Sequence, residues 1–332
     1  MTYSKAGKSR FESAGYVALL LFAWSAATQA AEPNYPGKPI RLVVGFTAGG
    51  PTDFVARTTA QKLSELVGQP VVVDNRAGAN GMVAAEYVSK LPPDGYTLFL
   101  SSSGLLAFSN HLYPNQAFDP FKELAPVTLA VTVPEILVAN PALPVRTVKE
   151  LVALAKSRPN QLNYATSGAG GMPHLAMESF NAVTGVKSVH VPYKGAAPAV
   201  TELIGGQVQI TFLDVPILLP QIKAGKLRAL AIATDKRAAL LPDVPTMREA
   251  GYPAVNADNW QGIVFAAGTP RELVAAMNGL LVKALQSSDT RARLAAQGIT
   301  AVGDSPESFA AFWRAEYDKW GKVIKSAGIK VD

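Results

Sequence analysis

The chain has 332 residues, of which 48% are hydrophobic and only 17% are charged, and it contains no cysteine. That length accommodates two domains of ordinary size, and the missing cysteines exclude disulfides, thiolate metal sites and a cysteine nucleophile. Lysine and arginine exceed the acidic residues by a formal +6, but they are scattered and do not alternate with aromatic residues, so no nucleic-acid partner is expected.

The first 30 residues have the three parts of a secretory signal peptide. Basic residues open the chain, residues 15–24 form an apolar run too short to span a bilayer, and small residues precede Ala31. We therefore expect a signal peptide over residues 1–30 that is cleaved near Ala30. An uncleaved membrane anchor is the alternative.

Short β-branched runs alternate with amphipathic stretches in the next part of the chain. Strands are predicted at residues 40–44, 71–74 and 96–100, and helices at about 54–67 and 82–90. This alternation is typical of an α/β fold, in which a parallel sheet carries helices on both faces.

A second α/β series follows, and the C-terminal part is mostly helical. Thr147 and Glu150 have the spacing of a capping box at the start of a helix over residues 148–157. Further strands are predicted at residues 162–165, 188–192, 208–212, 227–233 and 262–267, with helices ending near 180 and 204 and beginning near 270 and 305.

Two extended segments cross between the two α/β series. Residues 126–139 lead into the second series, and residues 255–262 lead back to the C-terminal helices. Two crossings predict a discontinuous domain 1, residues 36–132 and 260–332, and a domain 2 of residues 133–259. A cleft between two α/β lobes is then the expected ligand site.

Five predicted strand-to-helix loops are rich in Gly, Ser and Thr. Ligands of open α/β sheets bind beyond the carboxyl ends of strands, where helix N-termini present unpaired N–H groups and a partial positive charge. Small residues let an anion approach these groups. No loop is a nucleotide motif, since Pro173 stands where a dinucleotide fingerprint needs its third glycine. The five loops are residues 47–53, 75–81, 101–104, 167–171 and 193–196.

No catalytic, cofactor or metal site is expected. His174 follows Ser167 and Asp214 is available, but no G-x-S-x-G elbow exposes the serine, and the three histidines are spread too widely for a metal site. His174 is expected to order a loop or touch ligand. Asp53 either caps its helix or contacts ligand. Asp214 either orients water or a ligand amine, or binds Lys194.

Several motifs resemble one known family. They are YPGKPIRLVVGFTAGGPTDFVAR, VVVDNRAGANGMVAAEYV, LNYATSGAGGMPHLAMESF, VHVPYKGAAPAVTELIGGQVQITFLDV, GKLRALAIAT, VPTMREAGYP and NWQGIVFAAGTP. In this order they resemble the Bug-type extracytoplasmic solute receptors (TctC-like) of tripartite tricarboxylate transporters, and they cover nearly the whole chain after the leader.

The resemblance implies a two-lobed periplasmic binding protein of type II, the Venus-flytrap plan, with its ligand cleft between the lobes. It implies a monomer without cofactor or enzymatic activity that captures a small organic carboxylate and delivers it to the membrane permease of the transporter. A messenger for a membrane sensor kinase is an alternative, and an enzyme on the same fold is another. Ligand identity stays open, because residues 101–105 vary between relatives.

The resemblance also implies that two loops, residues 46–53 and 167–174, grip the carboxylate with backbone N–H groups and ordered water. Ala48 departs from the proline common there. We expect the N–H groups of four glycines, aided by two hydroxyls, to bind the anion in place of an arginine such as Arg76. The expected ligand-binding residues are Phe46, Thr47, Ala48, Gly49, Gly50, Thr52, Asp53, Asn75, Ser101, Ser102, Ser167, Gly168, Gly170, Gly171, His174, Tyr193, Lys194 and Asp214.

Overall fold

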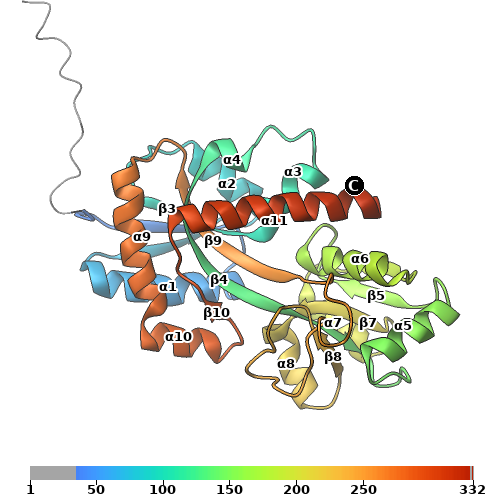
Figure 1. Cartoon of the computed structure of the whole chain (residues 1–332). Helices are drawn as coiled ribbons and strands as arrows, with labels where there is room; N and C mark the ends of the chain where they lie inside the picture. Colours follow the sequence, from blue (N-terminus) through green and yellow to red (C-terminus); the bar gives the residue numbers. More distant parts are fainter. Residues whose placement is uncertain (1–34, 330, 332) are drawn as a thin grey trace, which may run out of the picture. The chain divides into compact units, whose positions relative to one another are not determined.

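The computed structural model of the chain describes residues 35–329 and 331 (Figure 1). The chain divides into two units, residues 1–35 and 36–332, and the architecture below belongs to the second. The expected signal peptide lies outside the described residues. None of the helices in the described part combines the length and apolarity needed to cross a membrane.

Apart from a two-residue strand at Thr300–Ala301, which lies in the part predicted to be mostly helical, the strands occur at the predicted places, with a few changes of length. The predicted strand at 262–267 begins earlier, and the expected crossing at 126–139 is a single long strand. The strands are β1 Ile40–Val44, β2 Val71–Asn75, β3 Thr97–Ser102, β4 Leu124–Ala139, β5 Asn163–Thr166, β6 Val189–Pro192, β7 Ile210–Asp214, β8 Arg228–Ile232, β9 Asp258–Ala266 and β10 Thr300–Ala301.

The helices also match the predicted order, and the C-terminal part is helical as expected. The short helices after β3 and the helix after β7 are additional. The helices are α1 Pro51–Val67, η1 Ala79–Gly81, α2 Met82–Ser89, η2 Gly104–Phe108, α3 Ser109–Leu112, α4 Pro120–Glu123, α5 Val148–Ser157, α6 Met172–Thr184, α7 Ala196–Ile204, α8 Val215–Lys223, α9 Arg271–Gln286, α10 Ser288–Ala295 and α11 Pro306–Ala327.

The sheet is mixed, which corrects the expectation of a parallel sheet. The strand order is β2-β1-β3-β9-β4-β7-β5-β6, and β8 and β10 also pair with β4. The pairs β1–β2, β1–β3, β5–β6 and β5–β7 are parallel, as the strand–helix alternation predicts. The long strands β4 and β9 run antiparallel to their neighbours because they join the two α/β series directly.

Strand β4 passes from one part of the curled sheet to the other. Its first part pairs with β9 as far as Pro134, opposite Asp258, and its last part pairs with β7 from Glu135 onward. Because proline cannot donate to a sheet ladder, Pro134 suits the point at which β4 changes partners. The chain thus forms two lobes that share β4. The exact domain boundaries stay a prediction.

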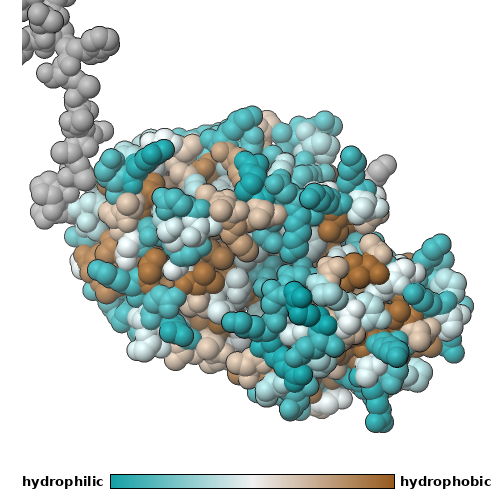
Figure 2. Space-filling model, in the orientation of Figure 1, coloured by the Kyte–Doolittle hydropathy of each residue, from teal (hydrophilic) through white to brown (hydrophobic). Residues whose placement is uncertain are grey.

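The C-terminal helix α11 packs its aromatic face into the core. Trp313 and Trp320 are buried, and the Trp313 indole donates a hydrogen bond to the carbonyl of Leu106. Helix α11 contacts η2 and β4, and it also contacts α6 of the second lobe (Figure 1). Figure 2 shows that hydrophilic and apolar residues are interspersed on this face of the molecule.

Candidate functional site

A cavity of about 490 Å³ lies where the ends of both series of parallel strands meet β4 and β9. It is bordered by the loops after β1, β3, β5 and β7 and by two residues of β9. The lining residues are Phe46, Thr47, Gly50, Pro51, Thr52, Asn80, Ser102, Ser103, Gly104, Val133, Ser167, Gly168, Ala169, Gly171, Met172, Pro173, Gly195, Ala196, Leu213, Asp214, Ile217, Asn259 and Gln261.

The N-terminus of α1 borders this cavity without a side-chain cap. Gly50 is the N-cap residue, with φ −83° and ψ 174°, and Pro51 follows at the first helical position. Proline has no N–H to satisfy, and the next helical N–H groups have no partner within the helix. Because Gly50 supplies no capping side chain, these N–H groups and the helix dipole are left for an anion.

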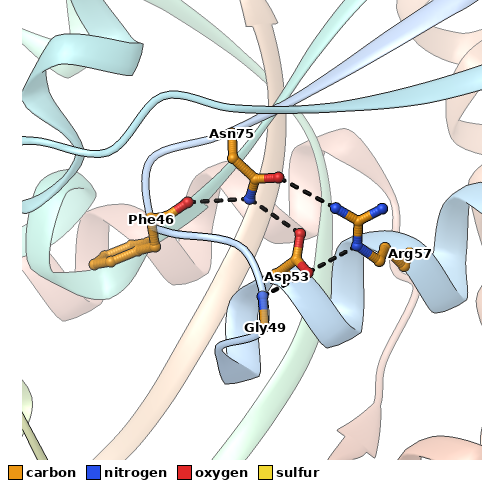
Figure 3. Close-up of polar contacts among 5 residues, drawn as sticks. All are labelled: Phe46, Gly49, Asp53, Arg57 and Asn75. Carbon is orange, nitrogen blue, oxygen red and sulfur yellow. Dashed lines mark hydrogen bonds and ion pairs between the residues drawn. The ribbon is translucent and has the colours of Figure 1, made fainter.

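Asp53 holds the loop before α1 in place (Figure 3). Its carboxylate accepts hydrogen bonds from the Gly49 N–H at 2.9 Å, from Arg57 Nε at 2.7 Å and from Asn75 Nδ2 at 3.0 Å. Asn75 Nδ2 also donates to the Phe46 carbonyl at 3.0 Å. Despite the opposing effect of burial, these hydrogen bonds lower the pKa of Asp53, so the carboxylate stays charged and fixes the loop.

The N-terminus of α6 repeats this arrangement in the second lobe. Gly171 is an uncapped N-cap with φ −83° and ψ 172°, and a proline again lies in the first turn, at Pro173. The preceding residue, Gly170, has φ +75°, as Gly49 has φ +84°. The Gly170 N–H donates to His174 Nδ1 at 3.1 Å, four residues on, just as the Gly49 N–H donates to Asp53. The two loops therefore share one backbone plan.

His174 accepts a hydrogen bond from its own loop and lies off the cavity wall. Its ring stacks on His190 with centroids 3.9 Å apart, and His190 stacks on Tyr164. Burial, and secondarily the neighbouring His190, lower the pKa of His174 to about 4. The ring is therefore neutral at physiological pH, and a neutral Nδ1 can accept the Gly170 N–H. The Tyr164 hydroxyl in turn donates a hydrogen bond to Glu178.

No side-chain cation lines the cavity: its described lining residues include no lysine, arginine or histidine. Lys194 is exposed, and Arg76 pairs with Asp74 at 3.0 Å and lies over the Tyr87 ring. Nor do the described residues contain a cluster of three acidic, histidine or cysteine side chains that could hold a metal. An anion in this cavity would meet backbone N–H groups and hydroxyls.

Half of the expected ligand-binding residues border the cavity. They are Phe46, Thr47, Gly50, Thr52, Ser102, Ser167, Gly168, Gly171 and Asp214. Those placed off its wall are Ala48, Gly49, Asp53, Asn75, Ser101, Gly170, His174, Tyr193 and Lys194. The N–H groups of Gly49 and Gly170, which we expected to bind the anion, instead donate to Asp53 and His174. No ion pair among the described residues joins Lys194 to Asp214.

Three amide side chains on the cavity wall are absent from the expected ligand-binding residues, although the predicted loop of residues 75–81 contains one of them. Asn80 lies in η1, and Asn259 and Gln261 lie in β9. Gln261 Nε2 donates to Thr52 Oγ1 at 3.2 Å, which links β9 to the first turn of α1. The available signal was polar residues within an otherwise apolar strand, flanking Trp260. Trp260 itself is buried and packs edge-on against Phe309, so it belongs to the core.

Comparisons with known proteins decide the family. The sequence model described as "Tripartite tricarboxylate transporter family receptor" matches residues 55–329. The chain belongs to this receptor family. Protein BugT of Bordetella pertussis is 39% identical over 299 residues, which cover 90% of this chain and 92% of BugT.

Solved structures that are more than 30% identical in sequence have a similar fold. Rpa4515 of R. palustris, solved with adipate, is 38% identical and superposes with a TM-score of 0.81 over 89% of this chain and 99% of its own. MatC from Rhodopseudomonas palustris, solved with bound malate, is 33% identical with a TM-score of 0.76 over 87% and 99% of the two chains. The expected family and the binding-protein fold are thereby confirmed.

Proposed function

We propose that this receptor captures a small organic carboxylate between the N-termini of α1 and α6. The observation that carries the proposal is the repeated loop plan: two uncapped glycine N-caps, each followed by a proline in the first helical turn, border one cavity. Helix N-termini attract anions through free N–H groups and the helix dipole. Thr52 and Ser167, which also border the cavity, supply hydroxyl donors.

The size of the cavity and the ligands of two relatives support a small acid. A volume of about 490 Å³ falls within the usual range of small-molecule sites. Relatives solved with adipate and with malate are similar in sequence and fold over nearly their whole length. The ligand class proposed for this chain is therefore a carboxylic acid of comparable size.

The proposed partner is the permease of a tripartite tricarboxylate transporter, with the receptor acting as a monomer in the periplasm. Family membership supports this delivery role. It also supports the proposal that the protein releases its ligand chemically unchanged. A sensor kinase remains the alternative partner. The two are distinguished by which membrane protein a ligand-loaded receptor retains when it is cross-linked in isolated membranes.

Export with cleavage near Ala30 is part of the same proposal. The order of basic start, short apolar run and small residues supports it. We expect the protein released by osmotic shock to have the mass of a chain beginning near Ala31. A full-length chain that stays with the membrane fraction would contradict the proposal.

Thermal unfolding in the presence of an organic-acid panel tests the binding function. An acid present at 100 times its dissociation constant adds about 2.7 kcal/mol to the free energy of unfolding, and we expect at least one small acid to raise the melting temperature clearly. The matched control is the neutral amide of the same acid. If the amide stabilises the protein as much as the acid, or if no acid stabilises it, carboxylate capture is the wrong function.

A further inference from the structure

A buried pair of carboxyl groups lies at the point where β4 passes between the lobes. Glu135 on β4 is directly opposite Asp214 on β7 in the antiparallel register, and opposite residues of such a pair place their side chains on the same face. Glu135 is fully buried, and no donor group in the described part of the chain reaches its carboxyl oxygens, so its hydrogen bond is a proton shared with the Asp214 carboxyl. Asp214 ends β7 and borders the cavity.

The amide contacts beside Asp214 orient its carboxyl as an acceptor. Asn259 Nδ2 donates to Asp214 Oδ1 at 3.0 Å, and Ser103 Oγ donates to the Asn259 oxygen at 3.0 Å. All three residues border the cavity. Because the Ser103 hydroxyl donates to the side-chain oxygen of Asn259, the NH₂ group of Asn259 is the end of the amide that faces Asp214. That contact favours the ionised form of Asp214.

Gln261 adds a second, independent acceptor to the same cavity wall. It is only 3% exposed, and its amide nitrogen donates to Thr52. Its amide oxygen has no hydrogen-bond partner among the described residues. A buried acceptor without a donor is costly, so this oxygen and the Asp214 carboxylate would both be satisfied by donors on a ligand.

The charges around the pair keep one proton on it near neutral pH. Burial, and then the Asp214 carboxylate, raise the pKa of Glu135 well above its ordinary value, and burial raises the pKa of Asp214 to about 6. Asp258 on β9 adds negative charge beside Glu135, and its own pKa is raised to about 7 mainly by burial. The described ion pairs include none that gives Glu135 or Asp214 a cationic partner.

The charged groups on neighbouring elements lie around Asp258. Three of them affect the pKa of Asp258: Lys319 of α11 lowers it, and Glu316 of α11 and Asp235 raise it. Lys319 is itself bonded to Glu316, at 2.9 Å, so it does not neutralise the pair. With one proton shared between Glu135 and Asp214, a single negative charge remains, and Asp214 presents it to the cavity.

We propose that the Glu135–Asp214 pair is a donor-selecting subsite of the ligand cavity. It accepts a hydrogen bond from the second polar group of the ligand, and it therefore favours acids with a hydroxyl or ammonium group over acids with a second carboxylate. A dicarboxylate binds there only when it brings a proton with it. The inference rests on the proposed carboxylate capture and adds the chemistry of the second binding group.

The pH dependence of a dicarboxylate follows from this arrangement. Two carboxylates that face each other across a hydrogen bond need one proton between them. At pH values above the pKa of the pair, binding of the dicarboxylate therefore takes up about one proton. The affinity should then fall by nearly tenfold per pH unit as the pH rises. An acid with an ammonium or hydroxyl group needs no extra proton, and its affinity should stay nearly constant over the same range.

Calorimetry with two matched ligand series tests the proposal. The first series is succinate, 4-hydroxybutyrate and 4-aminobutyrate, and the second is adipate, 6-hydroxyhexanoate and 6-aminohexanoate. Between about pH 6.5 and pH 8.5 the free carboxylates are all ionised. We expect a donor-bearing member of the better-bound series to bind at least about tenfold more tightly than the dicarboxylate at the upper pH. Buffers of different ionisation heats should report proton uptake with the dicarboxylate only.

Two isosteric variants and one control isolate the pair. Asp214→Asn should abolish the preference for donors and the pH dependence. Glu135→Gln replaces the protonated glutamic acid by a neutral isostere and should keep both, and their loss in Glu135→Gln would contradict a single charge on Asp214. Asp243→Asn is the matched control, because that exposed carboxylate does not border this cavity, and its selectivity should stay within about twofold of the unmodified protein.

The outcomes separate this inference from the proposed function. If the dicarboxylate binds most tightly at the upper pH without proton uptake, the subsite is wrong while carboxylate capture stands. If Asp214→Asn keeps the full preference and pH dependence, the subsite is also wrong. If no acid of either series or of the wider panel binds, both proposals fail.

Discussion

Gly171→Asp should abolish acid binding while leaving the unliganded protein as stable as before, or more stable by up to about 1 kcal/mol. Aspartate is a preferred N-cap residue, and Gly171 has the extended backbone that such a residue adopts. A Cβ there would meet only Pro173, at 3.7 Å. The new carboxylate would accept a hydrogen bond from the His174 N–H in the first turn of α6, where Pro173 has no N–H, and it would exclude the carboxylate of the ligand.

The size of this effect follows from the hydrogen bonds that are lost. Each charge-assisted hydrogen bond contributes about 1.5–3 kcal/mol, so losing two lowers the affinity at least about 100-fold. Calorimetry with the best acid measures the affinity, and urea unfolding measures the stability. Gly279→Asp is the matched control, since it adds the same charge on an exposed part of α9. Wild-type affinity in Gly171→Asp would exclude the α6 terminus from the site.

Gly262→Ala should destabilise the protein by about 3 kcal/mol or more, the upper part of the range for an overpacked core. A Cβ at Gly262 would lie 2.1 Å from Cζ of Phe309, which α11 packs against β9. Gly262 follows Gln261 of the cavity wall. Because glycine has no side chain, Phe309 of α11 packs directly against the strand that carries Gln261. Urea unfolding of both proteins measures the loss.

A double-mutant cycle distinguishes this contact from a general loss of strand stability. Phe309→Leu removes the aromatic ring with which the new methyl group would clash. The added cost of Gly262→Ala should therefore be smaller in the Phe309→Leu background than in the unmodified protein, with a coupling free energy of at least about 1 kcal/mol. Equal costs in the two backgrounds would show that Phe309 is not the reason for glycine at this position.

The glycine-rich loops were predictable because their signals are local. A buried strand followed by small residues and a helix start places the loop at a sheet edge, and Gly50 and Gly171, which border the cavity, lie in two such loops. The pattern could not tell which N–H groups are free. Gly49 and Gly170 have the same composition, but their N–H groups are engaged by side chains four residues further along.

Long-range pairing accounts for most of what the sequence did not reveal. The extended segment of residues 126–139 contains Pro134, yet β4 continues through it because its partner changes at that residue. Glu135 is 79 residues from Asp214, its cross-strand partner, and no local pattern joins them. For the same reason the sequence did not predict that Asn259 and Gln261 border the cavity: their strand returns from the far end of the second lobe.

The crystal structure of the receptor with its tightest-binding acid tests the central claim most directly. The account predicts one ligand carboxylate between the first turns of α1 and α6, with its oxygens about 2.7–3.1 Å from backbone N–H groups or from a bridging water. It also predicts no lysine or arginine side chain bonded to that carboxylate. A carboxylate held by an arginine or lysine side chain, or bound away from these two helix N-termini, would contradict it.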